Sequence, residues 1–227
     1  MALEIERALE SWGAEGLRCF GQILIERSTR GSFLLCHRDD GGRDDLIISF
    51  SAENAVKIAK FDDAGKYRPL KTAPNLRHGW RLELATLREL RHALDLLYPG
   101  RLAMFLAFRK KELATTPLRE TLKRQSGMYR VASQISNDQI DEVVGNFCRS
   151  DGGCLRTILW KRDESGAIAS TKLPPQKFDP AIDQAAGPRS APKAFGAATT
   201  MMPLLCQEAC NLLVAECRKE VKSERGL

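Results

Sequence analysis

Residues 147–156 read FCRSDGGCLR and residues 204–213 read LLCQEACNLL, so four of the seven cysteines fall into two close pairs. Cys148 and Cys154 enclose five residues, and Cys206 and Cys210 enclose three. Cysteine thiolates are preferred ligands of iron–sulfur clusters and of zinc. The pairing therefore predicts that the second half of the chain folds around a soft metal centre.

The number of paired cysteines indicates which metal centre is expected. A [4Fe–4S] cluster needs one anionic sulfur ligand for each iron, and the two pairs together supply that number. Their spacings differ from those of bacterial and plant-type ferredoxins, and common zinc modules have shorter spacings in both pairs. The pattern favours an iron–sulfur cluster and leaves a zinc site, or buried cysteines without a metal, as alternatives.

The neighbours of the two pairs suit this chemistry. We predict a helix over residues 207–222, so that Cys206 and Cys210 lie one turn apart at its start, where the positive end of the helix dipole favours thiolates. In the first pair, Gly152 and Gly153 permit a tight backbone turn around a bulky group. Arg149 and Arg156 flank this pair. We expect these two arginines to contact the cofactor and to offset the negative charge of the cluster.

The remaining cysteines and the histidines carry weaker signals. Cys19 and Cys36 lie in apolar, strand-like segments and are predicted core residues, whereas Cys217 is either a core residue or an alternate ligand. The three histidines, at positions 37, 78 and 92, have no partner at metal-ligand spacing in the sequence. His37 is expected at the surface at the end of a strand, and His78, in a basic segment, is a candidate for substrate contact.

Composition narrows the class of protein. The chain has 227 residues, 43% of them hydrophobic, and a net charge of +6. It has no apolar run long enough to span a membrane and no secretory signal at its start, so we expect a cytoplasmic location and cysteines held as thiols or metal ligands. The positive charge favours anionic partners. Because lysine and arginine are dispersed and aromatic residues make up only 7%, a nucleic acid is an unlikely partner.

The apolar patterns predict an α+β chain in two parts. Residues 1–115 are expected to form a mixed stabilising domain, packed on a mainly helical cluster-binding domain at residues 116–227 with a flexible loop at about 163–200. Strands are predicted at residues 20–26, 32–37, 46–50, 80–84 and 155–160. Helices are predicted at residues 1–16, 52–61, 86–98, 101–113, 117–124, 138–147 and 207–222.

Five stretches of the chain resemble a known family. They are KYRPLKTAPNL (66–76), HGW (78–80), RQSGMYR (124–130), CRSDGGCLRTILW (148–160) and LCQEACNLL (205–213). They are similar to the accessory region found fused to CbiX-type sirohydrochlorin chelatases, in which a stabilising domain precedes a [4Fe–4S]-binding domain. The resemblance implies that Cys148, Cys154, Cys206 and Cys210 are the four cluster ligands.

The resemblance also sets the expected function. We predict a [4Fe–4S] redox or accessory protein linked to sirohydrochlorin or cobalamin-type tetrapyrrole metabolism. Its expected partners are a chelatase, a redox protein or an anionic tetrapyrrole, which arginines would bind through carboxylates. The sequence contains no chelatase domain and no self-contained catalytic motif, so chelatase activity is not expected and enzymatic activity is left open. The alternative is a structural zinc-binding protein or a nucleic-acid-binding module.

Overall fold

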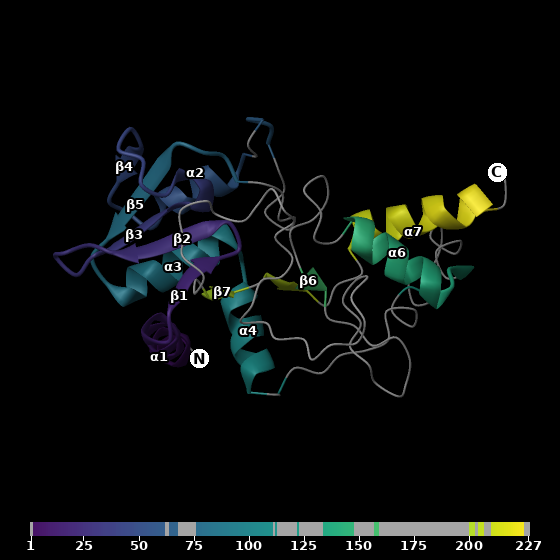
Figure 1. Cartoon of the computed structure of the whole chain (residues 1–227), viewed down its shortest axis with the longest axis horizontal. Coiled ribbons are helices and arrows are strands. Elements are labelled where there is room, and N and C mark those ends of the chain that lie inside the picture. Colours follow the sequence, from purple (N-terminus) through teal and green to yellow (C-terminus); the bar gives the residue numbers. More distant parts are fainter. Residues whose placement is uncertain are drawn as a thin grey trace. The chain divides into compact units, whose positions relative to one another are not determined.

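A computed structural model describes residues 2–61, 64–67, 76–110, 112, 122, 134–147, 157–158, 200–202, 204–206 and 210–224. They divide into two units (Figure 1). The first unit contains the N-terminal part of the chain up to Glu112 together with the segment that ends at Leu204. The second contains the rest, including the last helix. One boundary between the units falls between Leu204 and Leu205, one residue before Cys206.

The described part of the first unit is built on a mixed sheet with the strand order β4-β5-β3-β2-β1-β7. The three central neighbouring pairs are antiparallel, and the edge strands β4 and β7 run parallel to their neighbours β5 and β1. The strands are β1 (Leu17–Phe20), β2 (Ile23–Arg27), β3 (Phe33–His37), β4 (Ile47–Ser49), β5 (Trp80–Leu84) and β7 (Thr200–Met202). Through β7, residues from near the end of the chain thus become part of the sheet that the N-terminal residues form.

The turn between β1 and β2 is made at Gly21, where a single strand over residues 20–26 was predicted. That prediction is wrong because Gly21 adopts a positive φ of 57° and reverses the chain, so that Phe20 pairs with Ile23. Only glycine adopts this conformation without steric cost. Leu204 packs against the same glycine, and a Cβ atom placed there would lie 2.8 Å from its Cδ1.

The helices of the first unit pack around α3. They are α1 (Ala2–Ala14), α2 (Asn54–Ala59), α3 (Leu87–Leu97) and α4 (Arg101–Arg109). α3 contacts each of the other three helices and strand β5. Thr86 caps its start: the hydroxyl accepts the N–H of Glu89 at 3.2 Å while the Glu89 carboxylate accepts the N–H of Thr86 at 3.0 Å. This reciprocal pair satisfies backbone donors that a helix end leaves free.

The core of the first unit lies between these helices and the sheet. Trp80, Leu82 and Leu84 alternate along β5 and are all buried, as expected for a strand with one covered face. Two aromatic pairs pack edge-to-face: Trp12 of α1 with Phe105 of α4, and Phe20 of β1 with Tyr98 at the end of α3. The apolar residues that the sequence pattern places on one face therefore meet in a single packed layer.

In the second unit, helices α6 (Asn137–Phe147) and α7 (Asn211–Glu224) lie side by side (Figure 1). Ser136 caps α6: its hydroxyl accepts the N–H of Gln139 at 3.2 Å, and the Gln139 side chain accepts the N–H of Ser136 at 2.7 Å. The second unit also contains a short parallel pair of strands, β6 (Thr157–Ile158) and β8 (Leu205–Cys206). This unit contains the segments next to both predicted cysteine pairs.

The predicted α+β class is confirmed, and many predicted elements occur close to their expected positions. β5 matches the strand predicted at residues 80–84, α3 lies within the helix predicted at 86–98, and α6 contains the helix predicted at 138–147. Within the described part of the chain, no helix is both long and apolar enough to cross a membrane. The helix predicted at 117–124, apart from Leu122, and the loop at 163–200, apart from Thr200, lie outside the described residues. The proposed boundary near residue 115 stays a prediction.

Candidate metal centre

Cys206 lies in strand β8, and its side chain is only 5% exposed. Its backbone neighbour across the parallel pair is Ile158 in β6. The prediction that Cys206 and Cys210 lie one turn apart on a helix starting at residue 207 is wrong, because Cys206 is extended and α7 begins only at Asn211. The two cysteines are instead presented by the end of a strand and the start of a helix.

Cys210 occupies the N-cap position of α7. Its carbonyl accepts the N–H of Val214 at 2.9 Å, which is the first bond of the helix. Its Sγ accepts the N–H of Leu213 at 3.4 Å. A helix start carries free N–H groups and the positive end of the helix dipole, both of which stabilise a negatively charged sulfur. The partly exposed Cys210 is therefore suited to be a thiolate ligand.

The other predicted ligand pair, Cys148 and Cys154, lies outside the described residues, and so do Arg149 and Arg156. The described elements next to them can still be placed. Helix α6 ends at Phe147, immediately before Cys148 in the sequence, and packs against α7. Strand β6 begins three residues after Cys154 and pairs with the strand that contains Cys206. The flanking elements of the two cysteine pairs are thus neighbours in this unit.

The three remaining cysteines are buried. Cys19 and Cys36 lie on strands β1 and β3 on either side of Leu24, so their predicted core role is confirmed. Burial raises the pKa of Cys36 to about 12. Burial likewise raises the pKa of Cys217 to about 12. Both side chains are therefore neutral thiols at physiological pH, unlike a metal-binding thiolate.

Cys217 belongs to the packed face of α7. It is fully buried and lies one turn from both Leu213 and Val221, which are also buried. Residues four apart fall on one face of a helix, so this cysteine continues an apolar stripe and packs as a small hydrophobic residue. Cys217 is therefore a core residue, unlike Cys206 and Cys210, which are the predicted ligands.

The basic segment that contains His78, the candidate for substrate contact, is described only in part. Tyr67, Arg77 and His78 are exposed, whereas Arg68 and Lys71 lie outside the described residues, as does the segment 124–130. His78 does not extend freely into solvent, since its ring lies 4.0 Å from that of His37. His37 is only 1% exposed, so the prediction that it is a surface group is wrong. The antiparallel pairing of β3 with β5 brings the two histidines together. Sequence reasoning missed this contact because the histidines are 41 residues apart in the chain.

Comparison with known proteins defines the class of this chain. Residues 5–109 match the family model of the DR2241 stabilising domain, and residues 110–219 match that of a 4Fe-4S iron-sulfur cluster binding domain. The chain is thus an accessory region of the kind associated with chelatase-like proteins. This confirms the resemblance inferred from the sequence.

One solved protein that the chain resembles is DR2241 from Deinococcus radiodurans, a multi-domain protein of known crystal structure with structural similarity to chelatases and two additional novel domains. The two chains are 29% identical with a TM-score of 0.66, and the match covers 97% of this chain. It covers 41% of DR2241, so this chain spans less than half the length of that relative. No curated protein matches the chain.

Proposed function

We propose that this chain binds a [4Fe–4S] cluster through Cys148, Cys154, Cys206 and Cys210 and serves as a redox or accessory protein in sirohydrochlorin or cobalamin-type tetrapyrrole metabolism. The observation that carries the proposal is the position of Cys210, whose sulfur accepts a backbone N–H at the start of α7. Hydrogen bonds to sulfur and local positive potential are features by which proteins hold and tune such clusters. The family match over residues 110–219 independently supports the same assignment.

Each of the four proposed ligands lies in, or next to in the sequence, a different described helix or strand. Cys206 lies in β8 and Cys210 caps α7, while Cys148 follows α6 and Cys154 precedes β6 in the sequence. The packing of α6 on α7 and the pairing of β6 with β8 support a common site for both pairs. Arg149 and Arg156 would offset the negative charge of the liganded cluster. When bound, the cluster supplies one-electron transfer or a covalent cross-link between these segments.

The link to tetrapyrroles rests on the relative and on charge. DR2241 combines a region similar to this chain with structural similarity to chelatases, and sirohydrochlorin-type tetrapyrroles carry several carboxylates. The net charge of +6 favours an anionic ligand or an acidic partner. The proposed partner is accordingly a chelatase or a redox protein, with the tetrapyrrole itself as a possible anionic ligand.

Anaerobic reconstitution of the chain tests the cluster. The expected product is brown and contains about four iron and four sulfide per chain. Cys206→Ala and Cys210→Ala should each lose most of the bound iron. Cys217→Ala is the matched control, because this cysteine lies on the same helix as the proposed ligand at position 210 and should not affect iron content.

Two results would overturn the cluster assignment: full iron and sulfide loading of Cys210→Ala, or isolation of the chain with zinc and no sulfide. The tetrapyrrole link has its own test. Titration of the loaded chain with sirohydrochlorin, followed by its visible absorbance, should show saturable binding that weakens as salt is raised. The chain should also change the rate of a chelatase added in trans. Absence of both effects would remove the tetrapyrrole role and leave the cluster assignment intact.

A further inference from the structure

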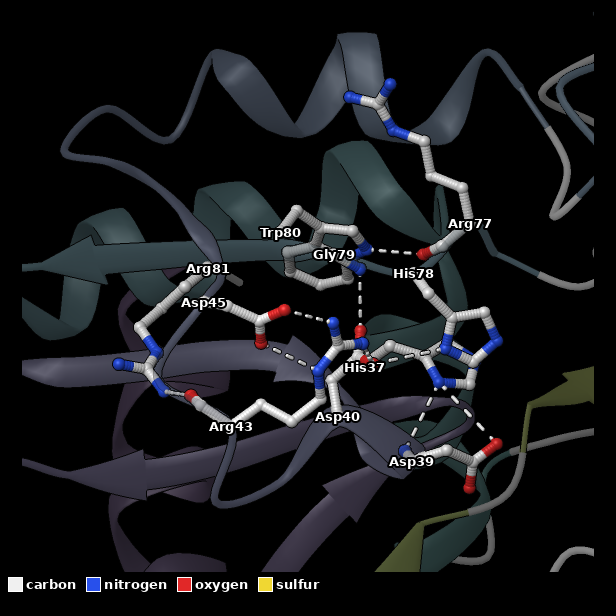
Figure 2. A network of polar contacts seen from close by, with 10 residues as sticks. All are labelled: His37, Asp39, Asp40, Arg43, Asp45, Arg77, His78, Gly79, Trp80 and Arg81. Atoms are coloured by element: carbon white, nitrogen blue, oxygen red, sulfur yellow. Dashed lines mark hydrogen bonds and ion pairs between the residues drawn. The ribbon is translucent and has the colours of Figure 1, made fainter.

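Two histidines far apart in the sequence meet at one edge of the N-terminal unit. His37 is the last residue of β3, and His78 lies just before β5. The antiparallel register, in which Cys36 pairs with Arg81, places these strand ends side by side. The two imidazole rings lie 4.0 Å apart, inclined by 54°. Figure 2 shows both rings beside the carboxylate of Asp39.

Asp39 completes a group of three potential metal ligands. It lies in the short 3-10 helix η1 (Arg38–Asp40), and its Oδ2 is 3.6 Å from Nδ1 of His37. One ligand atom from each of His37, Asp39 and His78 can be chosen so that all three lie within 4.8 Å of one another. We propose that these three side chains bind a divalent transition-metal ion, separately from the cysteine site.

The fit requires only a modest closure of the group. Zinc–ligand bonds of about 2.1 Å hold the ligand atoms of a tetrahedral site about 3.4 Å apart. The side chains of Asp39 and His78 are 48% and 45% exposed, so both can rotate by the up to about 1.4 Å that separates the spacing of 4.8 Å from this value. His37 is fixed in the core and serves as the rigid anchor of the site.

The hydrogen bonds of the two histidines leave suitable lone pairs. Nδ1 of His37 accepts the N–H of Asp39 at 3.2 Å, so this nitrogen carries a lone pair that a metal ion can take in place of that long hydrogen bond. Nδ1 of His78 lies 3.4 Å from Oδ1 of Asp40. With a proton on Nδ1 shared with this carboxylate, Nε2 of His78 is the nitrogen that keeps a lone pair for a metal ion.

Asp40 has the position of a supporting residue for a metal-binding histidine. Its carboxylate is almost fully buried and accepts the N–H of Gly79 and Nη1 of Arg43, each at 2.7 Å (Figure 2). A carboxylate held in this way orients the imidazole of His78, an arrangement that is common behind metal-bound histidines. The arrangement favours a functional ligand over a histidine that only contributes packing.

The donor set indicates the class of metal. Two imidazole nitrogens and one carboxylate suit zinc, cobalt, nickel or ferrous iron, whereas calcium and magnesium prefer all-oxygen sites. Three protein ligands leave at least one coordination position for water or another small ligand. An ion bound there would be exchangeable, because two of its three protein ligands are on the surface of the unit.

Proton NMR of the imidazole rings provides a direct test, since the chain has three histidines and the readout is independent of metal bound by cysteines. Zinc added to the full chain should shift the signals of His37 and His78 and leave that of His92 unchanged. His78→Gln and Asp39→Asn, both at exposed positions, should raise the apparent Kd reported by His37 at least about tenfold. His92→Gln is the matched control, because His92 is equally exposed and its Nε2 lies 3.9 Å from Glu53, which is not part of the proposed site.

The outcomes of this test distinguish a metal site from a group of side chains that has only a structural role. An unchanged Kd in His78→Gln, or parallel shifts of all three histidines, would overturn the proposal and leave the group as hydrogen bonds that fix the β3–β5 edge. Cys206→Ala and Cys210→Ala should retain the zinc response of the histidines. The proposal therefore stands or fails separately from the cluster assignment.

Discussion

The N–H of Gly21 donates a hydrogen bond to the carbonyl of Met202 at 3.0 Å. This bond extends the parallel pairing of β1 with β7 and places Leu204 directly against the glycine. Cys206 follows Met202 by four residues. The segment that leads into the proposed cluster site is therefore fixed at its start by the N-terminal sheet.

Gly21→Ala should destabilise the chain by about 1–3 kcal/mol, because an L-residue at φ 57° is strained and the new methyl group would overlap Leu204. Urea denaturation, followed by circular dichroism, measures the change. Gly13→Ala is the control: Gly13 is exposed in α1 with nothing near its Cβ position, so alanine should be neutral or stabilising by up to about 1 kcal/mol. Equal unfolding free energies for the two variants would contradict the role of Gly21.

The two capping boxes allow the units to be tested separately. Ser136→Ala removes the N-cap of α6 and should cost about 1 kcal/mol in the second unit, while Thr86→Ala should cost a similar amount in the first. Hydrogen exchange measured by mass spectrometry should show faster exchange in α6 for the first variant and in α3 for the second. The interpretation fails if each variant accelerates exchange equally in both helices.

Asp40 should contribute a pH-dependent part of the stability. Burial would raise its pKa, but the hydrogen bonds from Gly79 and Arg43 and the nearby charges of His78 and Arg43 hold it below the ordinary value of 3.8. The unfolded chain therefore takes up this proton more readily than the folded chain. The stabilisation is present above pH 3.8 and is lost as the pH falls through the lowered pKa.

Asp40→Asn should accordingly lower the unfolding free energy at pH 7 by about 1–3 kcal/mol, because it weakens a buried acceptor of hydrogen bonds from Gly79 and Arg43. The difference from the natural chain should shrink in acid, as measured by thermal unfolding between pH 7 and pH 3. Asp45→Asn is the control, since Asp45 also binds Arg43 but is exposed, and a smaller loss is expected. A constant difference over the whole pH range would show that the charge of Asp40 is not responsible.

Cys36 and Cys217 should resist alkylation in the folded chain. Their pKa values of about 12, against an ordinary value of 9.0, lower the thiolate fraction at pH 8 by roughly three orders of magnitude, and burial restricts access further. Iodoacetamide labelling of the cluster-free chain, followed by mass spectrometry, should modify Cys210 far faster than either. Labelling in urea should remove the difference, and rapid labelling of Cys217 without urea would disprove its assignment to the core.

Elements with strong local signals were predictable from the sequence. The alternation of Trp80, Leu82 and Leu84 specified β5, and the local patterns of residues 86–98 and 138–147 specified α3 and α6. These signals depend on residues within a few positions of one another. The turn at Gly21 was missed because the apolar residues on both sides of it continue one pattern, and the start of α7 was predicted too early because Cys206 and Cys210 have helical spacing.

The two cysteine pairs, the amphipathic helices and the resemblance to a chelatase-associated accessory region could be recognised before the fold was known, since all of these depend on residue identity and local spacing. Three features became visible only in the folded chain: Cys206 is extended while Cys210 caps a helix, β7 joins the N-terminal sheet, and His37 meets His78 beside Asp39. These features depend on pairing between strands far apart in the sequence. Such pairing is selected by the burial of the whole apolar surface, which no local pattern of residues specifies.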